Sequence, residues 1–147
     1  MNNSEKIYLC FITTDAEKDA IEIYKDRIKT DLWPIYSKTN QFRKVYTDVE
    51  VIFYIAGNGE SSQNFVGSAT INEVTDKFEK LDINSSNVKF YTKFKKFKQF
   101  KNSVYIKDIL NKLDFIKIKE KYGLTFQGGV TEVDEKSYNL IMNNGNN

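Results

Sequence analysis

Residues 48–56 read Asp-Val-Glu-Val-Ile-Phe-Tyr-Ile-Ala, and this stretch decides the fold class. It is rich in β-branched and aromatic side chains, which favour a buried strand. A polar connection follows at residues 57–64, and residues 65–74 return as a second strand, so an antiparallel hairpin is predicted. The apolar run at residues 6–12, which contains Cys10, indicates a further buried strand. The chain is therefore expected to be built around a sheet.

Helical patterns flank these strands. Residues 15–29 place alanine, tyrosine and isoleucine on one face at four-residue spacing, as in an amphipathic helix. A polar loop is expected from Trp33 to about residue 44, because Pro34 blocks continuation of the helix. A further helix is expected at residues 106–115, and Asp134 is expected to cap a last one. Strands mixed with flanking helices predict an α+β domain around a curved, partly closed sheet.

The length of 147 residues allows one domain, which we expect to span residues 1–142. The remaining residues, 143–147, read Asn-Asn-Gly-Asn-Asn and are expected to form a frayed tail or the start of a linker. The first residues lack the apolar core of a signal peptide, and no run approaches membrane-spanning length. These features predict a cytoplasmic protein without membrane contact.

Composition excludes several kinds of chemistry. The sequence contains no histidine and one cysteine, so it can form neither a Ser-His-Asp triad nor an imidazole or thiolate metal site. It has no Gly-rich phosphate-binding motif of the Walker or GxGxxG type. We therefore expect no catalytic residues, no metal and no cofactor, although carboxylate or lysine chemistry is not excluded by composition.

The lysines are unevenly distributed along the chain. Residues 89–101 contain six lysines and five aromatic residues without one acid, although the whole chain has 22 Lys and Arg against 20 Asp and Glu. Lysines neutralise phosphates and aromatic rings stack on bases, so the segment indicates a nucleic-acid-facing surface. An alternative interpretation is an amphipathic strand with phenylalanine in the core and lysine in water.

Three stretches carry a resemblance to a known family. They are residues 33–40 (Trp-Pro-Ile-Tyr, then Lys-Thr-Asn), residues 49–57 with the return Phe-Val-Gly-Ser-Ala at 65–69, and residues 115–141 with Tyr-Gly-Leu-Thr-Phe-Gln-Gly-Gly-Val at 122–130. In order and spacing they resemble the EVE domain of the PUA-like superfamily, which is related to YTH domains. The chain departs from the family where Asp48-Val49 replaces the more frequent Gly-Asp, and where Pro34 replaces the glycine that commonly follows the tryptophan.

The resemblance implies a PUA-like, EVE-type curved mixed β-sheet that forms a partly closed barrel. It also implies a non-enzymatic module that takes a flipped, modified base, such as a methylated one, into an aromatic pocket. A role as the specificity domain of a modification-dependent restriction system is one expectation, with DNA favoured over RNA. The alternatives are a reader of modified RNA, a carboxylate- and metal-dependent nuclease, and a protein-interaction module.

The resemblance and the residue chemistry together name the candidate site. Aromatic walls and polar groups for the base edge are expected at Trp33, Tyr36, Tyr54, Thr13, Thr14, Asn40, Gln127 and Gly128. Phosphate contacts are expected at Lys38, Arg43, Lys44, Lys93, Lys95, Lys96 and Lys98. Trp33 is interpreted as a loop ring over a cavity, whose loss the fold should survive. Core packing is the alternative for Trp33, Tyr36 and Tyr54, and helix capping is the alternative for Thr13 and Thr14. A turn is the alternative for Asn40, and a bulge for Gln127 and Gly128.

Overall fold

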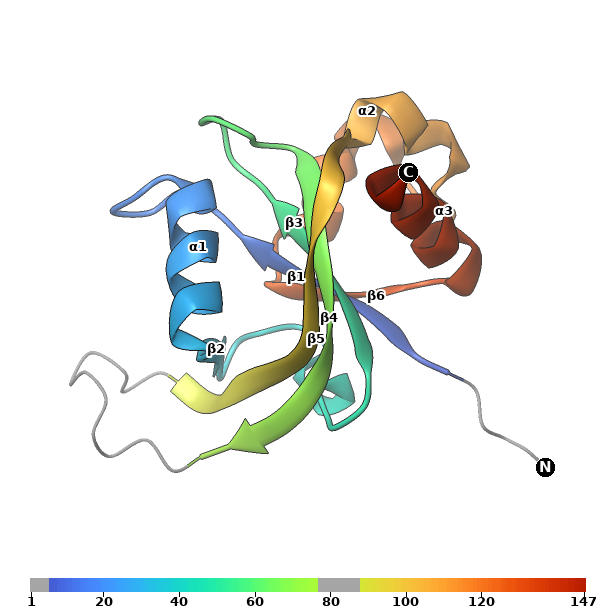
Figure 1. Cartoon of the computed structure of the whole chain (residues 1–147). Coiled ribbons are helices and arrows are strands. Elements are labelled where there is room, and N and C mark those ends of the chain that lie inside the picture. The colour runs from blue at the N-terminus through green and yellow to red at the C-terminus, as the bar shows by residue number, and fades with distance from the viewer. Residues whose placement is uncertain (1–5, 77–87) are drawn as a thin grey trace.

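A computed structural model describes residues 6–76 and 88–147, in which six strands form one mixed sheet that curls into a half-barrel (Figure 1). The strands are β1 Tyr8–Thr13, β2 Trp33–Tyr36, β3 Glu50–Ile55, β4 Asn64–Thr75, β5 Val88–Tyr105 and β6 Val130–Val133. Their order across the sheet is β2-β5-β4-β3-β1-β6. Only the central β1–β3 pair is parallel, and the other neighbours are antiparallel.

Helices cover both faces of this sheet. The helix α1 Ala20–Thr30 lies on one face, whereas α2 Ile106–Ile109 and α3 Glu135–Asn146 lie on the other (Figure 1). Short 3-10 helices are η1 Phe42–Lys44, η3 Leu110–Lys112 and η4 Lys119–Phe126. No helix among the residues described is long and apolar enough to cross a membrane. The α+β fold with a curved mixed sheet is therefore the one that the sequence predicts.

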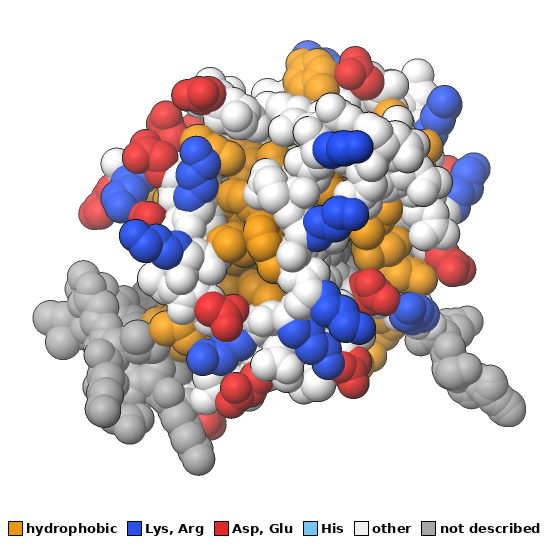
Figure 2. Space-filling view, viewed as in Figure 1, with side chains coloured by type: hydrophobic (Ala, Val, Ile, Leu, Met, Phe, Trp, Pro, Cys, Tyr) orange, Lys and Arg blue, Asp and Glu red, His pale blue; other side chains and the backbone are white. Residues whose placement is uncertain are grey.

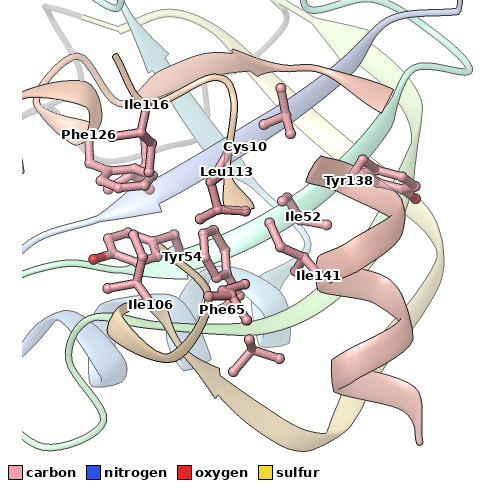
Figure 3. Close-up of a cluster of buried hydrophobic side chains, with 14 of the residues drawn as sticks. Cys10, Ile52, Tyr54, Phe65, Ile106, Leu113, Ile116, Phe126, Tyr138 and Ile141 are labelled. Atoms are coloured by element: carbon pink, nitrogen blue, oxygen red, sulfur yellow. The ribbon is translucent and has the colours of Figure 1, made fainter. Parts of the chain in front are cut away.

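The central strands supply two separate cores because their side chains alternate between faces. On β3, Phe53 points toward α1, whereas Tyr54 points into the cluster beneath α2 and α3 (Figure 3). On β1, Phe11 and Cys10 divide in the same way. Both strands are buried on both faces, which explains why their sequences read as continuous apolar runs and not as alternating ones.

Three element boundaries differ from those predicted. The helix predicted from residue 15 begins at Ala20, and the segment predicted as a loop after Trp33 contains β2. Pro34 is tolerated there because β2 is an edge strand, where a missing backbone donor costs little. The predicted helix at 106–115 is one helical turn followed by a 3-10 turn. The sequence Asn-Ser-Ser-Asn at residues 84–87 also predicts a turn, which lies outside the described residues.

The last helix continues beyond residue 142, through most of the segment expected to fray. Asp134 caps α3, as predicted, by accepting a hydrogen bond from the Ser137 amide at 3.0 Å. Near the other end, Gly145 is buried against the ring of Phe100 on β5. A Cβ atom at this position would lie 2.4 Å from that ring, so only glycine lets the helix approach so closely.

Replacing Gly145 by alanine should therefore destabilise the fold. In an exposed helix this change stabilises, but here overpacking should lower the free energy of unfolding by roughly 1–3 kcal/mol. Urea denaturation would measure the change. Gly123→Ala is the control, because a Cβ atom there would meet nothing within 4 Å. A stabilised Gly145→Ala variant would show that the end of α3 is not docked on β5.

Candidate nucleic-acid interface

A cleft of about 330 Å³ opens where β1 ends, between α1, β2 and the loop that precedes β6. We call it the main cleft. Thr13 and Thr14 come from the end of β1, Arg27 comes from α1, and Trp33 and Tyr36 come from the two ends of β2. Residues 126–130 close the opposite side. Segments from four parts of the sequence thus meet at one point.

Most of the base-pocket residues predicted from the sequence meet in this cleft. Those that line it are Thr13, Thr14, Trp33, Tyr36, Gln127 and Gly128. Tyr36 stands at the rim with 40% of its surface exposed, so its ring is available to a ligand. The cleft therefore has an aromatic side and a polar side, as the prediction requires.

Trp33 is a core residue as well as a cleft residue, which corrects its interpretation as a loop ring. Only 2% of its surface is exposed, and it lies on β2. Its ring centroid is 5.1 Å from that of Phe53 and 5.6 Å from that of Phe11. Trp33 thus forms the floor of the main cleft while its other side packs into the α1 core.

Two predicted pocket residues lie elsewhere. Tyr54 is buried on the opposite face of the sheet and stacks on Phe126 with ring centroids 3.9 Å apart. It lines a second cavity of about 410 Å³, which adjoins the main cleft and shares Thr14, Phe126 and Gln127 with it. Asn40 is exposed and lies in a turn, which is the alternative role predicted for it. Its backbone amide donates a hydrogen bond to the Gly128 carbonyl at 2.9 Å.

Hydrogen bonds fix the walls of the main cleft. The Thr13 hydroxyl donates to the Ala20 carbonyl at 2.9 Å, which ties β1 to the start of α1. The Ile12 amide donates to the Gly129 carbonyl at 2.9 Å and holds the opposite wall. Because these groups are satisfied within the protein, the Thr14 hydroxyl and the Gln127 amide are the uncharged polar side chains best placed to meet a ligand.

Asp15 joins the two loops beside the cleft. Its carboxylate accepts hydrogen bonds from the amides of Asn58 and Ala20, both at 2.9 Å, and these bonds lower its pKa. Gly57 packs against this carboxylate with a φ of 98°, a conformation that favours glycine. The β1–α1 loop and the β3–β4 loop are thereby held in one arrangement.

Arg27 is the cleft residue that the sequence analysis misses. Its guanidinium carbon lies 5.0 Å from the centroid of the Trp33 ring, and the side chain is half-buried. Desolvation lowers its pKa, and the nearby hydroxyl groups of Tyr36 and Tyr91 partly offset this effect. The signal was present in the sequence, because Arg27 falls three residues after Tyr24 on the apolar stripe of the helix.

The predicted phosphate contacts do not converge on the cleft, which Lys38 alone among them lines. Lys44 and Lys95 form ion pairs with Glu132 and Asp48, and the guanidinium of Arg43 lies over the Phe42 ring. The β5 lysines lie on a separate surface, where Figure 2 shows basic side chains over β4 and β5 and on α1, with apolar surface between them. Lys96 and Lys98 are exposed there, whereas Lys93 is half-buried.

In the described part of the chain, no group of three or more His, Cys, Asp or Glu side chains is placed to hold a metal ion. The acidic residues of 15–26 instead lie on the exposed side of α1 and the loop before it, where Asp26 pairs with Lys18 at 2.8 Å.

Comparisons with known proteins agree on the fold. The sequence matches no protein-family model and no curated protein. The structure matches the N-terminal domain of Staphylothermus marinus McrB with a TM-score of 0.64 at 13% identity, over 98% of this chain and 100% of that one. The fold is of the EVE and YTH type.

Two further matches carry ligands. The YTH domain of Zygosaccharomyces rouxii MRB1, in complex with N6-methyladenosine RNA, matches with a TM-score of 0.62 at 10% identity, over 99% of this chain and 90% of that one. Human THYN1, in complex with 5-methylcytosine-containing DNA, matches with a TM-score of 0.59 at 11% identity, over 97% and 99%. At these identities the likeness establishes the EVE/YTH-type fold, and the ligand of this chain has to be inferred from its own residues.

Replacing Trp33 by alanine should lower the free energy of unfolding by about 3–5 kcal/mol, because it opens a cavity among packed rings. Thermal or urea denaturation would measure the loss. Tyr46→Ala, at a ring that is 48% exposed, is the control and should change stability little. Full stability of the Trp33→Ala variant would restore the interpretation of Trp33 as a loop ring.

Proposed function

We propose that this chain is a non-enzymatic nucleic-acid-binding module that accepts a flipped, modified base in the main cleft. The observation that carries the proposal is the meeting of an aromatic floor, an aromatic rim and several polar side chains in one cavity. Trp33 supplies the floor, Tyr36 the rim, and Thr14 and Gln127 the groups that can hydrogen bond to a base edge.

The cleft meets the physical demands of base extrusion. Removing a base from its stack costs a few kcal/mol, which new stacking and edge contacts must offset. Stacking on one aromatic side chain contributes roughly 1–3 kcal/mol. The loops that carry the polar groups are held by backbone hydrogen bonds and by Asp15, so little ordering accompanies binding.

The similar structures support this function. MRB1 is bound to N6-methyladenosine RNA and THYN1 to 5-methylcytosine-containing DNA, so proteins of this fold accept modified bases in either nucleic acid. The likeness to the McrB N-terminal domain over its whole length supports a finer proposal, a specificity domain in a modification-dependent restriction system that acts on DNA. A reader of modified RNA is the second candidate, favoured by the YTH match.

Exposed lysines in the cleft and on β5 would contact the phosphate backbone of the nucleic acid. Lys38 lies in the cleft, and Lys96 and Lys98 are exposed on β5. Phosphate neutralisation releases counterions, so affinity should fall linearly in a double-logarithmic plot against salt. A protein-interaction module would show no such dependence, and a nuclease would turn over its substrate.

Tyr36→Ala should weaken binding of the modified oligonucleotide about 5- to 150-fold, the equivalent of roughly 1–3 kcal/mol for one stacked base. Fluorescence anisotropy would measure this with DNA and RNA oligonucleotides that carry 5-methylcytosine, N6-methyladenine or no modification. Tyr46→Ala is the control, because the Tyr46 side chain is about as exposed as that of Tyr36 but does not line the cleft. Equal affinity of both variants for a modified oligonucleotide, or no binding to any by the unaltered protein, would contradict the proposal.

A further inference from the structure

Arg27 places a positive charge inside the main cleft. It is the only side chain of α1 besides Ile23 that lines the cleft, and its guanidinium lies against the aromatic floor. The attraction between a guanidinium and an indole ring holds the charge over the floor, and the Tyr36 hydroxyl accepts one hydrogen bond from it. A guanidinium has five N–H donors, so others remain available to a ligand in the cleft.

The surroundings of Arg27 offer it the hydroxyl groups of Tyr36 and Tyr91 but no carboxylate from the lining of the cleft. No Asp or Glu lines the main cleft, and among the described residues none lies within ion-pairing distance of the guanidinium. A partly desolvated cation without a counter-charge is costly unless a hydrogen-bond acceptor satisfies it. With Lys38 also present, the charged lining consists of donors alone.

A base that enters this cleft must therefore present acceptors. Arginine pairs best with two acceptors side by side, to which it donates two parallel hydrogen bonds. Cytosine offers O2 and N3 next to each other, and its one donor is the exocyclic amino group. Adenine separates each ring acceptor from the next, with a donor beside N1 and N7. Guanine has the pair O6 and N7, but it brings two donor groups, N1 and N2, where cytosine brings one.

We infer that Arg27 is a specificity-determining residue that reads the O2–N3 edge of a modified cytosine, with 5-methylcytosine as the representative ligand. The inference rests on the proposed function and adds the identity of the base to it. The Gln127 side-chain carbonyl and the Thr14 hydroxyl are the lining groups that can accept from the cytosine amino group. The methyl group then faces the apolar part of the cleft.

The test measures the affinity of otherwise identical oligonucleotides that carry one 5-methylcytosine, one N6-methyladenine or one N2-methylguanine. The unaltered protein should bind the 5-methylcytosine oligonucleotide about tenfold more tightly than either of the others. Arg27→Met, which keeps an unbranched side chain but removes the guanidinium, should lose that preference while its affinity for N6-methyladenine stays the same. Arg27→Lys should also lose it, because an ammonium group cannot donate in a fork.

Lys29→Met is the matched control, as an exposed cation in the last turn of the same helix, and should keep the preference. Thermal melting of each variant would separate binding from folding, and Arg27→Lys replaces Arg27→Met if the latter unfolds. An equal loss of affinity for all three oligonucleotides would overturn the inference and make Arg27 a phosphate contact. A preference for methyladenine or methylguanine would also overturn it while the proposed function stands, whereas failure to bind any modified oligonucleotide would reject the proposed function itself.

Discussion

Burial of the parallel pair β1–β3 on both faces is the constraint on which the rest of the structure depends. Paired residues such as Phe11 and Phe53 pack into one core, and their neighbours Cys10 and Ile52 pack into the other. Helices must therefore cover both sides of the sheet. Because the two strands are parallel, their carboxyl ends lie at one edge. The loop after β1 lines both cavities, and the loop after β3 lines the second one.

The main cleft draws its rigidity from the core that lies below it. Trp33 contacts Phe53 and Phe11 on one side and forms the floor of the cavity on the other. Trp33 is buried and carries the Arg27 guanidinium over its ring, so it acts as a fixed floor, and the exposed ring of Tyr36 is the one open to stacking. The same arrangement makes stability and recognition inseparable at this residue, whereas Tyr36 and Arg27 contribute from the periphery.

Much of the fold could be predicted from the sequence because the central strands are apolar throughout and the α1 stripe repeats every four residues. The strand β2 was missed because four residues around Pro34 carry no periodic signal, and only pairing with β5 makes them a strand. Most of the base-pocket residues named with the help of the family resemblance line the main cleft. Arg27 was not, because a lone arginine on a helix reads as solvated unless the ring opposite it is known. Tyr54 was wrongly assigned to the base pocket. The alternation of side chains along a strand shows that Phe53 and Tyr54 face opposite sides of the sheet, but it does not show which side carries the site.

The most direct test of the central claim uses the fact that Trp33 is the sole tryptophan of the chain. Its emission therefore reports the floor of the cleft without interference from another indole. Titration with an oligonucleotide that carries one 5-methylcytosine should change this emission saturably, with the same midpoint as binding measured by anisotropy. The unmethylated counterpart should leave the emission unchanged at the same concentrations. Binding of the methylated oligonucleotide with no change in Trp33 emission would contradict the account, because the base would then lie outside the main cleft.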